Sequence, residues 1–371
     1  MSTDNQIPRG VLPLQALEKM VADGRIRSRT PVTPDQLQPS SIDLRLGHEA
    51  YRVRASFLAS GDATITSKLE KYRLHTIELT RPAVLEKGCV YIVPLQEELA
   101  LPPEISGKAN PKSSTGRLDI FTRLITDEGR QFEIVPAGYR GRLYAEVVPR
   151  TFSVVVRQGE RLSQLRLFQG DYTPSDALLR QLEAEESLVF LPDETRGEPT
   201  IQNGLRVSVD LEGDSEIIGY RAKKHAPLID LARVQHYDPE EFWDPIRRNE
   251  GRSLILDPED FYILASRERV RIPALYAAEM VPFDPTIGEF RIHYAGFFDP
   301  GFGYGAGDIN GTRAVLEVRS HEVPFILEHG QIVASLVFEK LIEKPRLLYG
   351  EGIGSSYQRQ GLKLSKHFRS A

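Results

Sequence analysis

The chain has 371 residues, of which 40% are hydrophobic and 27% charged, a composition typical of globular proteins with room for two domains. Its 47 basic and 52 acidic residues give a net charge of −5, which argues against a broad nucleic-acid surface but permits a local phosphate site. The single cysteine, Cys89, excludes internal disulfides and Cys-rich zinc sites, and the lack of a signal-peptide pattern or membrane-length apolar run predicts a cytoplasmic protein without membrane contact.

Helical patterns are few and short. The first covers residues 13–23, where leucines recur at helical spacing ahead of Gly24, a suitable helix end. A second helix is expected over residues 175–186, behind a serine cap, and a third over residues 238–248. Residues 193–199 are charged and contain Gly and Pro, so they are expected to form a linker.

Most of the remaining sequence is typical of short strands. Apolar residues alternate with polar ones, or β-branched residues cluster, between closely spaced Gly and Pro. The clearest such runs are residues 89–93, 142–148, 152–156 and 161–168. The sequence therefore predicts a mostly β protein with few helices.

The second half of the chain repeats the first. Glu146 and Glu317 lie in similar apolar runs 171 residues apart, and tyrosine and proline positions upstream keep the same offset. Residues 41–43 also resemble residues 208–210, at a smaller offset that implies a change in loop length. A domain-sized period indicates tandem duplication. We expect a first domain over residues 1–174, a helix and linker over 175–198, and a second domain over 199–371.

The segment from Lys112 to Arg117, Lys-Ser-Ser-Thr-Gly-Arg, is the first candidate for chemistry. Hydroxyl and backbone donors between two cations suit an oxyanion such as phosphate, although a solvated turn before a strand has the same composition. The duplicated segment, residues 283–288, lacks both serines and the arginine. The fold therefore does not require the motif, which favours a functional interpretation.

Three further features are ambiguous when each is taken alone. The Asp-Pro-Gly string at residues 299–301 is a turn signal, yet its aspartate could also bind a sugar hydroxyl. Glu146 and Glu317 would usually face solvent from their strands, but in a cleft desolvation would make either a usable general base. The Gly-rich tail over residues 349–361 is either a frayed end or a flap that closes over a ligand.

Together these strings resemble the dCTP deaminase branch of the dUTPase-like fold superfamily. The resemblance rests on motifs from both halves, at residues 23–25, 41–47, 112–117, 295–303, 316–317 and 357–361. It implies two tandem dUTPase-like domains, each a distorted β-barrel or jelly roll. Neither half has the complete motif set and the retained parts are complementary, so we expect one composite site, within one chain or across a subunit interface.

The resemblance also implies a reaction, the hydrolytic deamination of dCTP to dUTP and ammonia. In this interpretation Glu317, preferred over Glu146, activates water, while Ser113 and Arg117 orient the reactants. Mg²⁺ would arrive with the triphosphate, without zinc and without metal-ligating side chains. Substrate binding is assigned to Lys112, Ser114, Thr115, Gly116, Ala295, Asp299, Val315, Leu316, Tyr349, Tyr357 and Gln360.

Other interpretations stay open at this point. The chain could be a dUTP pyrophosphatase, a bifunctional enzyme that continues to dUMP, or a non-catalytic nucleotide-binding regulator, and dTTP or dUTP are further candidate ligands. The resemblance favours a homo-oligomer, a trimer in particular. It also implies a basic residue just before Tyr357, where this chain has Ser356, and Arg359 or Lys363 could replace it. We predict that Ser113 and Arg117 lie much closer to Glu317 than Asp284 and Gly288 lie to Glu146.

Overall fold

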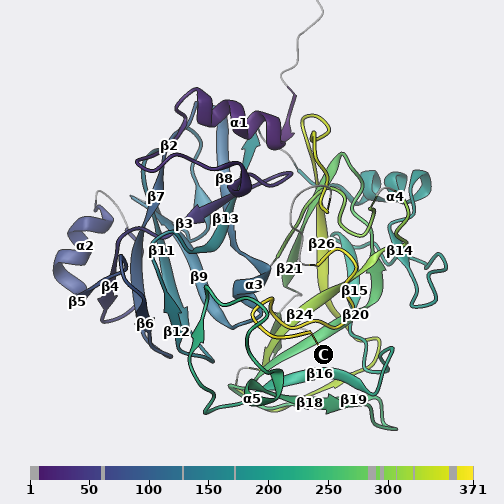
Figure 1. The fold of residues 1–371 in the computed structure, drawn as a ribbon. Helices are drawn as coiled ribbons and strands as arrows, with labels where there is room; N and C mark the ends of the chain where they lie inside the picture. The colour runs from purple at the N-terminus through teal and green to yellow at the C-terminus, as the bar shows by residue number, and fades with distance from the viewer. Residues whose placement is uncertain are drawn as a thin grey trace, which may run out of the picture.

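A computed structural model describes the chain from residue 8 to residue 370, except for residues 60–62, 128, 171–172, 283–289, 293–295, 306, 321 and 351–356. Two β-rich halves lie side by side, the N-terminal half in purple and blue and the C-terminal half in green and yellow (Figure 1). The predicted mostly β, two-domain architecture is confirmed. Within the described residues, no helix combines the length and the apolar character needed to cross a membrane.

The first half contains two main sheets. One has the strand order β1-β13-β8-β10, with β3 also paired to β13. Its strands are β1 (Gly10–Val11), β3 (Ile42–Arg45), β8 (Ile105–Pro111), β10 (Ile134–Val135) and β13 (Arg161–Gln169). The other has the order β5-β4-β7-β11-β9, with β2 also paired to β7. Its strands are β2 (Ile26–Ser28), β4 (Glu49–Val53), β5 (Arg73–Glu78), β7 (Val90–Ala100), β9 (Ile120–Thr126) and β11 (Arg140–Pro149).

The second half repeats this arrangement. Its larger sheet has the order β18-β16-β20-β24-β22, with β14 on β20, and its smaller sheet the order β15-β26-β21-β23. The larger sheet contains β14 (Val189–Phe190), β16 (Ile217–Ala222), β18 (Trp243–Arg247), β20 (Phe261–Val270), β22 (Phe290–Ile292) and β24 (Thr312–Ser320). The smaller contains β15 (Leu205–Ser208), β21 (Tyr276–Pro282), β23 (Phe297–Phe298) and β26 (Ile332–Lys340).

Strand register confirms the duplication. Glu146 on β11 lies opposite Ile92 on β7, and Glu317 on β24 lies opposite Ile263 on β20, so both pairs keep the 171-residue offset. A β-bulge interrupts the β13–β3 pairing and recurs at the same place between β26 and β15. A bulge is a local device that chance would not repeat in register. The two halves therefore share the same strand pairing and register.

One detail of the predicted repeat is wrong. The sequence pattern aligns residues 41–43 with 208–210, but Ile42 lies opposite Leu165 and Leu205 lies opposite Leu336. Ile42 and Leu205 are therefore the equivalent positions. The short Ser-x-Asp strings mislead because the second one falls at the end of β15, where its aspartate accepts backbone hydrogen bonds in the following turn.

Two predicted helices are confirmed. Helix α1 (Leu14–Ala22) ends before Gly24, whose φ of 65° suits a glycine. Helix α4 (Asp176–Glu185) is capped by Ser175, whose hydroxyl accepts from the Leu178 amide. Its leucines pack into the core of the second half. The 175–198 segment is thus attached to that half along its apolar face.

The third predicted helix is wrong over most of its length. Helix α5 covers only Pro239–Phe242, and the chain then becomes strand β18, paired with β16. Pro245 removes a backbone donor from any helix here, and the strand buries Trp243. Two unexpected helices are α2 (Ile65–Tyr72), which covers one face of β7 and β11, and α3 (Ser113–Gly116).

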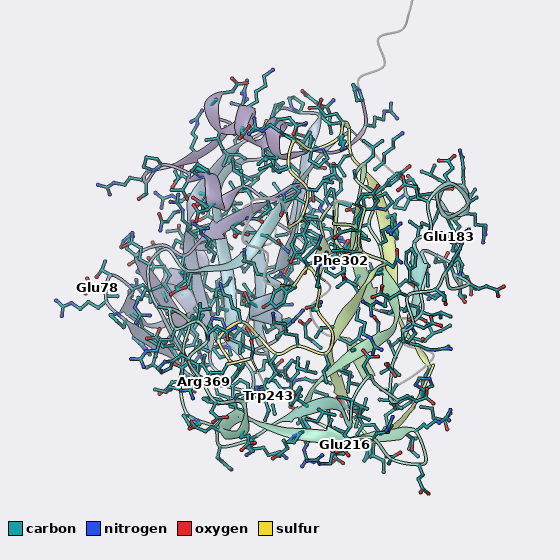
Figure 2. The ribbon with its side chains drawn as sticks, turned by 45° about the vertical axis from the view of Figure 1, so that its right-hand side comes forward. Glu78, Glu183, Glu216, Trp243, Phe302 and Arg369 are labelled. Atoms are coloured by element: carbon teal, nitrogen blue, oxygen red, sulfur yellow. The ribbon has the colours of Figure 1, made fainter. Side chains whose placement is uncertain are left out.

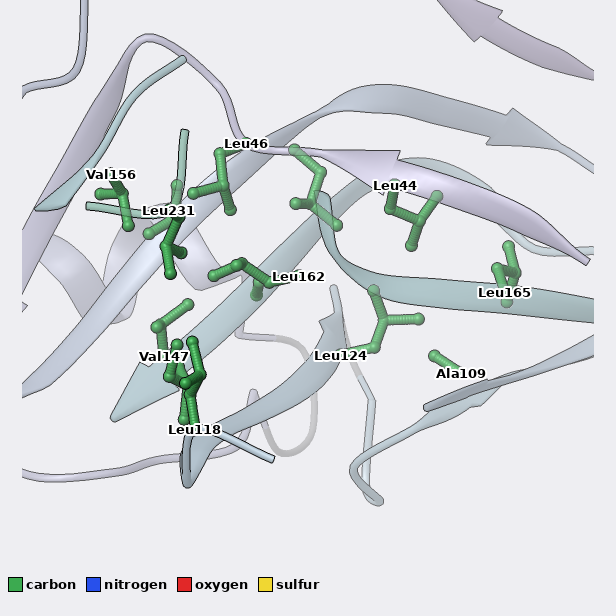
Figure 3. Close-up of a cluster of buried hydrophobic side chains, with 14 of the residues drawn as sticks. Leu44, Leu46, Ala109, Leu118, Leu124, Val147, Val156, Leu162, Leu165 and Leu231 are labelled. Carbon is green, nitrogen blue, oxygen red and sulfur yellow. The ribbon is translucent and has the colours of Figure 1, made fainter. Parts of the chain in front are cut away.

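The two halves interlock through their cores. Strand β17 (Ile229–Asp230) of the second half pairs in parallel with β12 (Val154–Val156), which also pairs with β6 (Ala83–Leu85). Leu231 consequently packs among first-half residues, as Figure 3 shows. The equivalent sheet of the second half has two strands, β19 (Ser253–Leu256) and β25 (Phe325–Glu328).

Aromatic residues extend this shared core beside β12. Trp243 and Phe242 of the second half pack against Phe152 of the first, with ring centroids 5.5 and 5.8 Å apart. Phe368 of the tail joins the same cluster, and the next residue, Arg369, is labelled close to Trp243 in Figure 2. The tail thus returns from the second half to the first.

Candidate active site

A cavity of about 680 Å³ lies between the halves and is lined by residues of both. The first half contributes Lys112, Ser113, Ser114 and Arg117 from the predicted motif. The second half contributes six residues that the sequence singled out, Asp299, Val315, Glu317, Tyr349, Tyr357 and Gln360. One chain therefore brings the complementary motifs together.

Three predicted substrate residues are placed away from the cavity, and a fourth is not described. Thr115 and Gly116 are buried in α3 and do not line the cavity. Leu316 points into the core of the second half, because side chains alternate along β24 and its neighbours Val315 and Glu317 face the cavity. Ala295 lies outside the described residues.

The serine motif forms the short helix α3 directly after β8. Lys112 keeps an extended backbone at its start, with its amide donating to the Leu162 carbonyl at 2.9 Å. The Lys112 ammonium forms an ion pair with Asp43 of β3. The tail secures the other side of the helix, since the Ser365 hydroxyl donates to the Ser114 carbonyl at 2.9 Å. The motif is a fixed wall of the cavity and not a solvated turn.

Arg117 joins this wall to the tail. Its guanidinium donates to the Gln360 side-chain oxygen at 2.7 Å and to the Lys363 carbonyl at 2.9 Å. The same group stacks over the Tyr357 ring, 3.9 Å from its centroid. Tyr357, Gln360 and Lys363 therefore hold the tail against the first half, and of the two alternatives the frayed end is wrong for residues 357–361.

Glu317 is a buried carboxyl group on the cavity wall, with 6% of its surface exposed. Burial raises its pKa to about 8, because water no longer stabilises the charged form. The nearby positive charge of Arg117 lowers this pKa and the negative charge of Asp119 raises it. Such a group exchanges a proton near neutral pH, as a general acid or base must.

Glu146, the equivalent residue of the first half, has a different environment. It is fully buried and forms an ion pair of 2.5 Å with Arg123 on the adjacent strand β9. Its strand partner Ile92 belongs to an apolar cluster with Ile65 and Leu69 of α2. Glu146 does not line the cavity that Glu317 lines. Asp284 and Gly288 lie outside the described residues, so the predicted contrast between their distance to Glu146 and the distance of Ser113 and Arg117 to Glu317 stays a prediction.

The Asp-Pro-Gly string forms a tight turn that directs Asp299 into the cavity. Gly301 and Gly303 have φ values of 94° and 66°, and a Cβ on Gly303 would lie 2.1 Å from the Val270 carbonyl oxygen. Phe302 between them packs in the second-half core, near the centre of the molecule in Figure 2. Burial raises the pKa of Asp299, which accepts a 2.5 Å hydrogen bond from Ser40.

Sequence analysis missed the buried arginine that supports this turn. Arg166 on β13 is fully buried and pairs with Glu339 on β26 at 2.6 Å. Its other nitrogen donates to the Ser40 hydroxyl at 3.2 Å and lies 3.9 Å from Asp299. The guanidinium also stacks on Phe297 at 4.0 Å. A charged residue inside an apolar strand run was the signal available in the sequence.

The tail places an unexpected cation in the cavity. Arg359 forms an exposed ion pair with Asp308, and Lys363 lies 5.7 Å from the centre of the Tyr357 ring, so neither residue lines the cavity. Lys366 does line it, together with Arg161 at the start of β13. No motif marked these two residues, which are adjacent only in the folded chain.

Comparison with known protein families divides the chain at the same place as the fold. The family model of the 2'-deoxycytidine 5'-triphosphate deaminase (DCD) N-terminal domain matches residues 8–171, and that of the C-terminal domain matches residues 175–368. The crystal structure of 2'-deoxycytidine 5'-triphosphate deaminase from Agrobacterium tumefaciens is 51% identical, with a TM-score of 0.86, over 91% of this chain and 100% of that one.

Curated relatives match a shorter stretch. The "dCTP deaminase, dUMP-forming" of Methanosphaera stadtmanae is 26% identical over 168 residues, which are 45% of this chain and 82% of that protein. The "dCTP deaminase" of Haloarcula marismortui is 30% identical over 146 residues, 38% of this chain and 71% of that protein. Duplicated β halves that share a cavity with a serine–arginine motif and a buried glutamate define a two-domain protein of this class. The chain belongs to the dCTP deaminase family.

Proposed function

We propose that the protein converts dCTP and water to dUTP and ammonia. The observation that carries this proposal is the single cavity in which Ser113 and Arg117 of one half meet Glu317 of the other. The cavity combines a buried carboxyl group with hydroxyl and guanidinium donors, which suits addition of water to a polar ring. The names of the relatives point to the same substrate.

In the proposed reaction the ionised Glu317 takes a proton from water while the water oxygen bonds to C4 of cytosine. The proton passes to N3, and a second proton transfer through Glu317 lets the amino group leave as ammonia when the C4–N4 bond breaks. The water oxygen remains as the C4 carbonyl oxygen of uracil. Ser113 and Arg117 orient the water and the carboxylate and stabilise the charge that develops on them.

The remaining cavity residues suit the nucleotide's sugar and phosphates. Asp299 would accept a hydrogen bond from a sugar hydroxyl, and Ser114 and Lys112 would donate hydrogen bonds to the phosphates from the same cavity. Mg²⁺ would enter with the triphosphate, which supplies its oxygen ligands. The described residues contain no group of three or more His, Cys, Asp or Glu arranged to hold a metal ion.

A second candidate is a bifunctional reaction that continues to dUMP, because relatives of this chain have both names, "dCTP deaminase" and "dCTP deaminase, dUMP-forming". One experiment separates the two. Purified protein is incubated with dCTP and Mg²⁺, and dUTP, dUMP, pyrophosphate and ammonia are resolved over time. Equal dUTP and ammonia without pyrophosphate supports the first proposal, and equal dUMP, pyrophosphate and ammonia supports the second. If a nucleotide binds but no product forms, the protein is a nucleotide-binding regulator.

The trimer implied by the resemblance also stays a proposal. The site needs no second chain for the residues named above, so assembly and activity can be measured separately. Light scattering coupled to gel filtration gives the number of chains, and activity per chain across the same concentrations gives the dependence on assembly.

A further inference from the structure

Three cations line one end of the cavity, Lys112, Arg161 and Lys366. Two of them have carboxylate partners. Lys112 pairs with Asp43, and Arg161 pairs with Asp35 at 2.7 Å and lies 4.0 Å from the same Asp43. Within the described part of the chain, the half-buried Lys366 ammonium has no ion pair or hydrogen bond. Lys366 is thus the one of these three described cations whose charged group is not held by a carboxylate.

The backbone around Lys366 is held on both sides. Its amide donates to the Tyr357 hydroxyl at 3.3 Å, and its carbonyl accepts from the Gln235 amide at 3.0 Å. The Ser365 hydroxyl is hydrogen-bonded to α3, and the His367 Nε2 atom lies 3.2 Å from the Leu231 carbonyl oxygen. The side chain therefore starts from a fixed point on the cavity wall, unlike a lysine at the end of a loose tail.

Without a bound anion, the surroundings of Lys366 disfavour the charged form of its side chain. Burial and the adjacent Lys112 lower the pKa of Lys366, and Arg161 acts in the same direction. The negative charges of Glu160 and Asp43 oppose this effect, but Asp43 also lies close to the cations of Lys112 and Arg161. A bound triphosphate would bring further negative charge to Lys366 and form charge-assisted hydrogen bonds with an ammonium already in place.

We propose that Lys366 is a substrate-binding residue that contacts the phosphate chain of the nucleotide, and that it serves as the tail's phosphate-binding cation in this protein. The assignment rests on the proposed function, since it takes a nucleoside triphosphate as the ligand. It predicts that the contribution of Lys366 depends on the phosphates and not on the base.

The test compares Lys366→Met, which keeps length and removes charge, with Lys366→Arg, which restores a cation. Arg359→Met is the matched control, because it removes a tail cation outside the cavity. All are made in the Glu317→Gln background so that substrate is not consumed, and affinities for dCTP, deoxycytidine and inorganic tripolyphosphate are measured by calorimetry.

We expect Lys366→Met to weaken dCTP and tripolyphosphate binding by about 10- to 100-fold, the range for losing a hydrogen bond to a charged group. Deoxycytidine affinity should change less than about twofold, Lys366→Arg should recover most of the loss, and Arg359→Met should match the parent. Unchanged dCTP affinity in Lys366→Met, or an equal loss for deoxycytidine, would overturn the assignment. If tripolyphosphate bound only when Lys366 is present and dCTP did not bind, the assignment of the phosphate site would stand. The proposed substrate would then be rejected.

Discussion

The Arg117 guanidinium donates to the Gln360 side-chain oxygen at 2.7 Å, which joins residues 243 positions apart in the sequence. Gln360 in turn donates to the Arg313 carbonyl at the start of β24, the strand that carries Glu317. The serine–arginine motif is therefore connected to the strand of the proposed base through one tail side chain. A change on either side of this connection should affect the geometry of the other.

Replacing the proposed base should separate binding from turnover. Glu317→Gln keeps the shape of the side chain but cannot take a proton, so we expect kcat to fall by roughly 10²- to 10⁴-fold. The affinity for dCTP should stay within a few-fold. Glu146→Gln is the matched control, because Glu146 occupies the same register outside the cavity, and its kcat per folded molecule should be unchanged. Equal kcat for Glu317→Gln and the parent protein would remove Glu317 from the reaction.

The raised pKa of Glu317 predicts a pH profile. Since the ionised form takes the proton from water, kcat/KM should rise about tenfold per pH unit up to a pKa of about 8 and then level off. Initial rates at low dCTP concentration between pH 5.5 and 9.5 give this curve. A profile that is flat across pH 6 to 8 would contradict the assignment.

The same carboxyl group should make stability depend on pH. Its pKa is about 8 in the folded protein against an ordinary value of 4.5, so the folded state retains a proton that the unfolded state releases between these values. The contribution of Glu317 to folding is therefore favourable at low pH and is lost as the pH rises towards 8. Glu317→Gln has no such proton, so its Tm minus that of the parent should grow from pH 5 to pH 8. A constant difference would show that Glu317 titrates normally.

Arg166 should contribute strongly to the stability of the junction between the halves. Arg166→Met leaves the Glu339 and Asp299 carboxyl groups buried without their cation, so the free energy of unfolding should fall by roughly 3–5 kcal/mol. Arg247→Met is the control, because the Arg247–Glu216 pair is exposed and should contribute less than about 1 kcal/mol. Urea unfolding measures both. Similar losses for the two variants would contradict the structural role of Arg166.

The turn that holds Asp299 should depend on Gly303. A left-handed backbone costs roughly 1–2 kcal/mol for alanine, and Gly303→Ala adds a collision with the Val270 carbonyl. Gly330→Ala is the control, since Gly330 also has a positive φ but has open space around it. We expect Gly303→Ala to lose more stability in urea and to raise KM for dCTP. Equal losses would mean that the close approach does not matter.

The strand plan and the division of the site could be predicted because they depend on local patterns. Alternating runs predicted β7, β11 and β13, and the constant offset between Glu146 and Glu317 predicted the duplication. The resemblance to the family showed which motifs each half lacks, and their complementary loss predicted one shared site. These features can be predicted from a single sequence, because each is a pattern within one short segment or between two similar segments.

Other features depend on contacts that no segment contains. No local pattern marks Lys366, and Arg166 is marked only by its place in an apolar run. Only the packing of one half on the other gives them partners or a cavity. The helix predicted over residues 238–248 failed for a related reason. Its composition suits a helix, but pairing with β16 and burial of Trp243 favour a strand.

The junction between the halves also has a consequence for dilution. Residues from both sides of the cavity are tethered within one polypeptide, so their encounter is intramolecular, and its effective concentration does not depend on how much protein is present. Where separate chains supply the two sides of a site, dilution separates them and the site is lost. Fusion of the two sides by duplication therefore keeps this site assembled when only a few copies of the protein are present in a cell.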